Sequence, residues 1–152
     1  KGNRIMSNPG PAITTSSHPQ IVGSNQTLRL LGSALGVNAS ATGDTAIPVV
    51  NSTNFLAKEL IVTNANNAGA TANASGTILA VRTAPNAGGT SLFGAVTLTP
   101  CTTPTGVSYN DASATTAAYA NLTNLYARVT TASGNTATVD VYVYGYDFSQ
   151  NQ

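Results

Sequence analysis

The segment Leu125–Tyr146, LYARVTTASGNTATVDVYVYGY, holds the strongest secondary-structure signal in the chain. From Val139 to Tyr144 every second residue is valine, which is the period of two expected of a β-strand. A second β-rich run covers Leu125–Thr131, and the short loop between the two runs contains Gly134, a residue that can adopt positive φ. Two β-rich runs joined by a short glycine-containing loop predict an antiparallel hairpin.

The two strands of this predicted hairpin carry candidate contact residues. In the second strand the valines share one face, which is expected to join a sheet core, and three tyrosines share the other face. The tyrosines either cap the edge of the core within one subunit, contact a partner protein or bind a sugar. Tyrosine and arginine are favoured at interface centres because each combines a large contact area with a polar group. The predicted interface residues of the hairpin are therefore Tyr126, Arg128, Tyr142, Tyr144 and Tyr146.

Further short β-rich runs are separated by turn residues along the rest of the chain. With the hairpin they give seven or eight short strands, without alternating helices and without a heptad repeat. This pattern predicts an all-β fold, an antiparallel β-sandwich of jelly-roll-like form. The additional strands are expected near residues 26–31, 45–50, 55–64, 77–83 and 92–98.

The run Phe55–Asn64 is apolar on both sides, as expected for a strand inside a sandwich. Strict alternation places Leu56 with Leu60 and Val62 on one face, although the first half also has good helix formers. The stretches 65–75, 85–89 and 100–111 are rich in small residues, proline and glycine and are expected to be loops, and residues 112–121 allow a helical turn.

The N-terminal residues 1–24 show no periodicity and contain Asn8-Pro9-Gly10-Pro11, which interrupts regular structure. They are mildly basic, because Lys1 and Arg4 occur there and no acidic residue precedes Asp44. Either they are a disordered tail, or they form an extended arm that contacts a neighbouring subunit, with Arg4 and Ile5 as contact residues. The predicted organisation is an arm over 1–24, a β-sandwich domain over 25–148 and a polar tail over 149–152.

The chain has few charges. Only 7% of its residues are charged and the net charge is +1, whereas an average soluble domain has about 25% charged residues. Such a composition fits proteins whose surfaces are buried in an assembly, or secreted and surface proteins. The cations are scattered, which argues against nucleic-acid binding. There is no apolar run of about 18 residues, so we expect no membrane span. The N-terminal residues lack the apolar core of a signal peptide.

Groups that carry out chemistry are sparse and dispersed. His18 is the only histidine and Cys101 the only cysteine, so neither a multi-histidine metal site nor an internal disulfide is expected. Cys101 is expected to be a small, half-buried loop residue. No phosphate-binding loop or nucleophile motif is present. We therefore predict no catalytic, cofactor or metal site, no small-molecule substrate and no enzymatic activity. A glycosidase pair would require clustering of Asp44, Asp111, Asp140 or Asp147 in one cleft.

Several strand patterns between residues 44 and 147 resemble those of a known group of proteins. The chain is similar here to the capsid decoration, or cement, proteins of tailed bacteriophages, which are small β-sandwich proteins encoded beside capsid genes. The resemblance rests on strand patterns alone and transfers no functional residue. The patterns are Asp44–Val49, Leu60–Ala65, Leu125–Thr131 and Ala137–Gly145.

The resemblance implies a structural virion protein on the outer surface of a capsid. Such proteins bridge neighbouring subunits of the major capsid protein, often as homotrimers at three-fold positions. Three alternatives remain open from the sequence: a receptor- or glycan-binding fibre or adhesin domain, a glycan hydrolase, and the major shell protein of a small virus. The arm lacks the density of basic residues expected for genome packing, which argues against the shell protein.

Overall fold

The computed structural model describes residues 28–49, 54–112, 119–120 and 122–148. Within these ranges the chain forms strands and their connections, without a helix. Every strand pair among them is antiparallel, so the predicted all-β class is confirmed. The arm predicted for residues 1–24 and the tail predicted for residues 149–152 lie outside the described residues.

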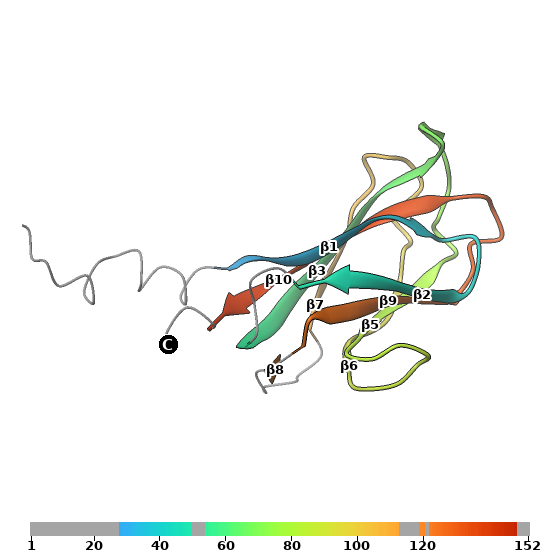
Figure 1. The fold of residues 1–152 in the computed structure, drawn as a ribbon. Coiled ribbons are helices and arrows are strands. Elements are labelled where there is room, and N and C mark those ends of the chain that lie inside the picture. Colours follow the sequence, from blue (N-terminus) through green and yellow to red (C-terminus); the bar gives the residue numbers. More distant parts are fainter. Residues whose placement is uncertain (1–27, 50–53, 113–118, 121, 149–152) are drawn as a thin grey trace, which may run out of the picture.

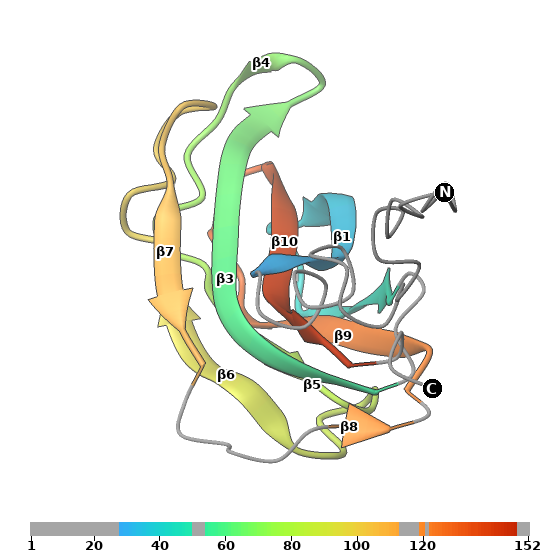
Figure 2. The ribbon, with the colours of Figure 1, turned by 90° about the vertical axis from the view of Figure 1, so that its left-hand side faces the viewer.

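The strands form two sheets that pack against each other around one core (Figures 1 and 2). Sheet A has the order β1, β10, β3, and three short strands pair with β3; sheet B has the order β2, β9, β5, β6. Sheet A consists of β1 (Arg29–Asn38), β10 (Thr138–Asp147), β3 (Asn54–Asn67), β4 (Ala70–Thr71), β7 (Ser108–Asp111) and β8 (Tyr119–Ala120). Sheet B consists of β2 (Gly43–Pro48), β9 (Asn124–Thr131), β5 (Ile78–Arg82) and β6 (Ser91–Thr97).

The order of the eight longer strands is that of a jelly roll. Sheet A runs β1, β10, β3, β7, as Figure 2 shows across one layer, and sheet B runs β2, β9, β5, β6. The first strand therefore lies beside the last, and the second strand lies beside the last but one. This nesting of Greek keys is what distinguishes a jelly roll from a meander of hairpins. The predicted jelly-roll-like β-sandwich is confirmed.

The core lies between the two sheets and follows the period-two pattern of the strands. Each fully buried valine or leucine in it contributes roughly 1.5–3 kcal/mol relative to an exposed side chain. Its fully buried members include Leu60 and Val62 on β3, Val139, Val141 and Val143 on β10, Leu79 and Val81 on β5, and Leu125, Ala127 and Val129 on β9.

The predicted hairpin at the C-terminus is wrong. The first of its strands, β9, pairs with β2 and β5 in sheet B, whereas β10 pairs with β1 and β3 in sheet A. The connection between them crosses from one sheet to the other. It is held by Ala39, whose carbonyl accepts from the Ser133 N–H and whose N–H donates to the Ala137 carbonyl, both at 2.9 Å. Gly134 in this connection does have positive φ, 77°.

A bulge in β3 changes the side that its residues face. Lys58 has no partner on β10, so the alternation shifts by one residue at that point. The prediction that Leu56 shares a face with Leu60 is wrong for this reason, and the helix allowed for the first half of the segment does not form. The inward residues are Phe55, Ala57, Leu60 and Val62, and the outward residues include Leu56, Glu59 and Ile61.

Asp140 on β10 joins irregular positions on its two neighbouring strands. Gly36 on β1 and Asn64 on β3 both adopt left-handed backbone conformations, with φ of 67° and 57°. The Asp140 carboxylate accepts hydrogen bonds from the Gly36 backbone N–H at 2.8 Å and from Asn64 Nδ2 at 2.7 Å. One side chain thus fixes a bulge on either side of the central strand, including the one in the outer strand β1.

Three connections differ from the sequence-based expectation. Residues 100–111 were expected to be a loop, but they end in β7, which extends sheet A beyond β3. The loop expected at 65–75 begins with the last residues of β3 and includes β4, so that a hairpin projects past the other strands (Figure 2). Residues 119–120 form β8 where a helical turn was allowed, and most of the remaining positions of that segment lie outside the described residues.

The strands expected near 77–83 and 92–98 are β5 and β6.

Candidate interaction surfaces

The tyrosines of β10 lie on the outer face of sheet A. Tyr142, Tyr144 and Tyr146 are half-buried, while the residues that alternate with them are buried on the core side: Val141, Val143, Gly145 and Asp147. The two unlike faces predicted for this strand are therefore confirmed. The tyrosines are held laterally by neighbouring strands and remain open on their outer side in the described part of the chain.

Neighbouring strands extend this surface in rows across the sheet, because residues paired in register on antiparallel strands point to the same side. The row through Tyr142 is Ser33, Tyr142, Ile61 and Tyr109, on β1, β10, β3 and β7. The row through Tyr144 is Leu30, Tyr144, Glu59 and Asp111, and Tyr146 pairs with Leu56. We call this surface the tyrosine face; it gathers four of the six tyrosines in the chain.

Large exposed apolar side chains concentrate on the same sheet. Leu30 and Leu35 on β1 are 45% and 68% exposed, and Tyr109 on β7 is 53% exposed. Val107, directly before β7, is 49% exposed. Among the described residues these are the large hydrophobic side chains with substantial exposure, and every one is on sheet A or next to it. The exposed apolar surface of the described domain is therefore one-sided.

The tyrosine face has an acidic corner at its β7 side. Glu59 and Asp111 are directly opposite each other in the β3–β7 pairing, and the Tyr109 hydroxyl donates to Asp111 Oδ1 at 3.3 Å. Hydrogen bonding to the Glu59 carboxylate, then desolvation and the negative charges of Asp111 and Glu59, raise the pKa of Tyr109 to about 12. Two like charges in facing positions repel each other, so this corner gains stability from a cation placed beside it.

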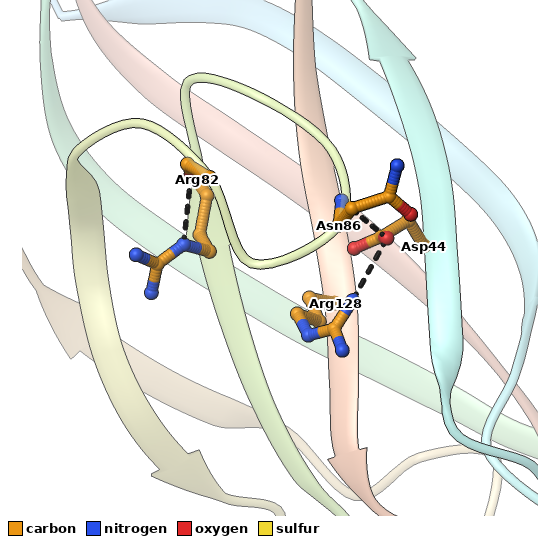
Figure 3. Close-up of polar contacts among 5 residues, drawn as sticks. Asp44, Arg82, Asn86 and Arg128 are labelled. Carbon is orange, nitrogen blue, oxygen red and sulfur yellow. Dashed lines mark hydrogen bonds and ion pairs between the residues drawn. The ribbon is translucent and has the colours of Figure 1, made fainter.

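The other two predicted hairpin contacts, Tyr126 and Arg128, are on the outer face of sheet B. Arg128 Nη1 lies 2.9 Å from Asp44 Oδ2 on β2, and the Asn86 backbone N–H also donates to that oxygen, at 2.8 Å (Figure 3). Arg82 holds the same β5–β6 loop by donating from Nε to the Gly88 carbonyl at 3.0 Å. Arg128 therefore has an ion-pair partner within its own subunit.

The structure separates the predicted interface residues into two groups. Tyr142, Tyr144 and Tyr146 belong to sheet A, and Tyr126 and Arg128 belong to sheet B, on the opposite side of the sandwich. One flat partner surface is unable to contact both groups at once. The remaining two predicted contacts, Arg4 and Ile5, lie outside the described residues.

The four aspartates considered for a glycosidase pair do not gather in one cleft. Asp44 lies on the outer face of sheet B, Asp111 and Asp140 on the outer face of sheet A, and Asp147 is buried, with its Oδ2 atom 3.2 Å from Arg29 Nη1. The described residues enclose no pocket, and they contain no group of three or more His, Cys, Asp or Glu side chains placed to hold a metal ion. No helix within the described ranges has the length and hydropathy of a membrane span.

Cys101 is more deeply placed than the sequence indicated. It lies in a loop, as expected, but its side chain is fully buried, and Sγ donates to the Val62 carbonyl at 3.5 Å. Burial raises the pKa of the Cys101 thiol, and a hydrogen bond with the Ser108 backbone lowers it in part. The thiol is therefore protonated near neutral pH, which disfavours reaction as a nucleophile.

Sequence reasoning missed the residues that widen the tyrosine face. Strict alternation separates Leu56 from Glu59 and Ile61, whereas the bulge at Lys58 brings all three to the outer face. Tyr109 and Asp111 were assigned to a loop. The alternation in Ser108-Tyr109-Asn110-Asp111 was a signal for a strand, but three turn-forming residues just before it concealed the signal.

Comparisons of the chain with protein-family models, with curated proteins and with solved structures gave no match.

Proposed function

We propose that this protein is a structural virion protein that decorates and stabilises a bacteriophage capsid. The observation that carries the proposal is the tyrosine face, a wide aromatic and apolar surface on one side of the jelly roll. Tyrosine-rich surfaces of this kind favour protein contacts, since each ring contributes a large contact area and a hydroxyl. The low charge content of the chain, 7%, agrees with a surface that is buried in an assembly.

The proposed partner is the major capsid protein, and the proposed site of action is the outer capsid surface. A protein that binds only the assembled shell shifts the equilibrium toward that shell. A homotrimer on a lattice of matching symmetry binds through several weak contacts at once, so modest affinity per subunit is sufficient. In this proposal the protein acts by bridging neighbouring capsid subunits, without catalysis and without a cofactor.

Paired substitutions on the two outer faces test the proposal. Tyr142→Ser with Tyr144→Ser removes two rings from the tyrosine face, and the control Tyr126→Ser removes one ring from the outer face of sheet B. Loss of two interface tyrosines is expected to weaken binding to assembled shells by about 100-fold. Tyr126→Ser is expected to bind like the unmodified protein. Binding is measured by co-sedimentation with shells, and the free energy of unfolding of each variant is measured by urea denaturation.

Two results would contradict the proposal. The first is that the protein does not bind shells, and that shells without it resist heat and pressure equally well. The second is that Tyr142→Ser with Tyr144→Ser lowers the stability of the domain as much as it lowers shell binding, which returns the tyrosines to a role in the fold.

A second candidate function is favoured by the same rings. A row of tyrosines flanked by the carboxylates Glu59 and Asp111 also suits a receptor- or glycan-binding domain of a fibre or adhesin, since aromatic rings stack on sugars and carboxylates accept their hydroxyl protons. A glycan array separates the two functions. Selective glycan binding that is lost in the Tyr142→Ser, Tyr144→Ser variant supports the second function, and an array without binding removes it.

A further inference from the structure

We infer that the tyrosine face of one copy binds the N-terminal segment, residues 1–27, of a second copy. The inference deepens the proposed function and rests on it: the segment links like subunits at the acidic corner of the tyrosine face, beside β7, and leaves the tyrosines of β10 to the shell. It rests on four observations: the charge of each surface, the availability of the two outer faces, the apolar residues of the segment, and the place where the segment joins the sheet.

The charges of the segment and of the face are complementary. The outer face of sheet A carries the carboxylates Glu59, Asp111 and Asp140 and the single ammonium of Lys58, a net charge of −2. Residues 1–27 contain Lys1 and Arg4 and no acidic residue, a net charge of +2 with His18 neutral. The opposite charges of the segment and the face attract each other. A cationic side chain of the segment is most strongly favoured at the acidic corner, where the carboxylates of Glu59 and Asp111 repel each other.

The outer face of sheet B is the poorer receptor for this segment. Its described charges are Arg82, Arg128 and Asp44, a net charge of +1 that repels a basic segment. Its one carboxylate already accepts hydrogen bonds from Arg128 and from the Asn86 backbone, and the β5–β6 loop that contains Asn86 reaches across this face (Figure 3). Sheet A lacks such a cover among the described residues and holds the exposed apolar side chains.

The apolar residues of the segment also match the tyrosine face. Ile5 follows Arg4 directly, so a segment whose arginine lies at the acidic corner brings an aliphatic side chain to the adjacent tyrosine row. The guanidinium of Arg4 gains a further cation–π contribution where it lies over a tyrosine ring. The row through Tyr142 contains no lysine that would compete for this position.

The geometry of the N-terminus favours a second copy over the same one. β1 begins at Arg29, opposite Gly145 near the end of β10, so the chain that precedes it joins sheet A at one end of the strands (Figure 1). Covering its own face requires a reversal at this junction, and reaching a neighbour does not. A fully extended segment of 27 residues spans at most about 90 Å, against about 33 Å for a ten-residue strand, so length does not prevent the exchange.

A charge exchange tests the pairing in the full-length protein. Glu59→Lys is expected to weaken self-association about tenfold at low salt, because an attraction is replaced by a repulsion. Adding Arg4→Glu to Glu59→Lys is expected to restore it. The matched control places lysine at the exposed positions Ala46 and Ala95 of sheet B, which changes the net charge by the same amount and should leave association unchanged. Sedimentation velocity over a concentration series measures each variant.

Disulfide trapping tests which copy supplies the segment. One chain carries Ile5→Cys and the other Tyr109→Cys, and the buried Cys101 does not compete. The inference predicts a disulfide between the two chains on mixing under oxidising conditions, and little bonding when Tyr126→Cys on sheet B replaces Tyr109→Cys. A monomeric disulfide in a chain carrying both Ile5→Cys and Tyr109→Cys, without interchain bonding, overturns the exchange between copies.

The inference and the proposed function fail through different results. A protein that is monomeric at all concentrations, or in which Arg4→Glu does not rescue Glu59→Lys, overturns the inference even if the protein binds shells. A protein that self-associates as described but does not bind shells keeps the inference and refutes the decoration role.

Discussion

Replacing Asp140 is expected to loosen the two strands that flank the centre of sheet A. Its carboxylate accepts one hydrogen bond from Gly36 on β1 and one from Asn64 on β3, at 2.8 and 2.7 Å. A hydrogen bond to a charged group contributes about 1.5–3 kcal/mol, and the exposed bond to Gly36 belongs at or below the low end of this range. We expect Asp140→Ala to lower the free energy of unfolding by about 2–3 kcal/mol.

The conservative variant Asp140→Asn separates the two bonds. Its amide keeps one acceptor oxygen but presents an NH₂ group to the second donor, so the expected loss is about 1–1.5 kcal/mol, half that of Asp140→Ala. The matched control is Asp111→Asn on the same face. It is exposed and opposite Glu59, and is expected to change stability by less than about 0.5 kcal/mol.

Urea unfolding monitored by far-ultraviolet circular dichroism measures these differences, with the slope of the transition unchanged between variants. A loss below about 0.5 kcal/mol for Asp140→Ala would refute the reasoning, because it would place the carboxylate in water rather than between two strands. Equal losses for Asp140→Ala and Asp140→Asn would show that the charge alone, and not the pair of hydrogen bonds, holds the strands.

Three further predictions concern single residues. Gly145→Ala is expected to destabilise the domain by about 1–3 kcal/mol in the same urea assay, because a Cβ there meets the Leu56 carbonyl oxygen and lies 2.7 Å from Leu31 Cδ1; wild-type stability would contradict this packing. Cys101 is expected to react with a thiol reagent only as fast as the domain unfolds, and rapid labelling of the native protein would contradict its burial. The phenol of Tyr109 is expected to ionise near pH 12, and Glu59→Gln should move its pKa toward 10, as followed by phenolate absorbance. Because folding holds the phenol protonated, its contribution to stability is present below pH 10 and is lost between pH 10 and 12.

The sequence predicted the strands better than their partners. The alternation of Leu125, Ala127 and Val129, and of the valines of β10, correctly marked two strands with one buried face each. The pairing was wrong because inward residues on both strands contact one core, and the pattern is the same whether that core lies beneath a hairpin or between two sheets. Only distant contacts decide between these arrangements, and a local pattern does not record them.

The surface was predictable where it follows one strand and unpredictable where it crosses strands. The tyrosines of β10 share a face by their spacing alone. Glu59 and Tyr109 come beside them only through the register of β3 with β10 and β7, which depends on the bulge at Lys58. The ion pair of Arg128 was not predictable from a local pattern either, since its partner Asp44 is 84 residues away in sequence.

The place of β10 has a consequence for synthesis. It is the last strand of the described residues, yet it lies between β1 and β3 and so separates these two strands. Until β10 has been synthesised, β1 and β3 lack the strand that pairs with both of them. Sheet A can therefore form completely only after residue 147 has left the ribosome. Non-local pairing of this kind is slow to form, so we expect sheet A to be completed late in folding. A chain that stops at residue 137 would lack the centre of a sheet, and chaperones and proteases would treat it as unfolded.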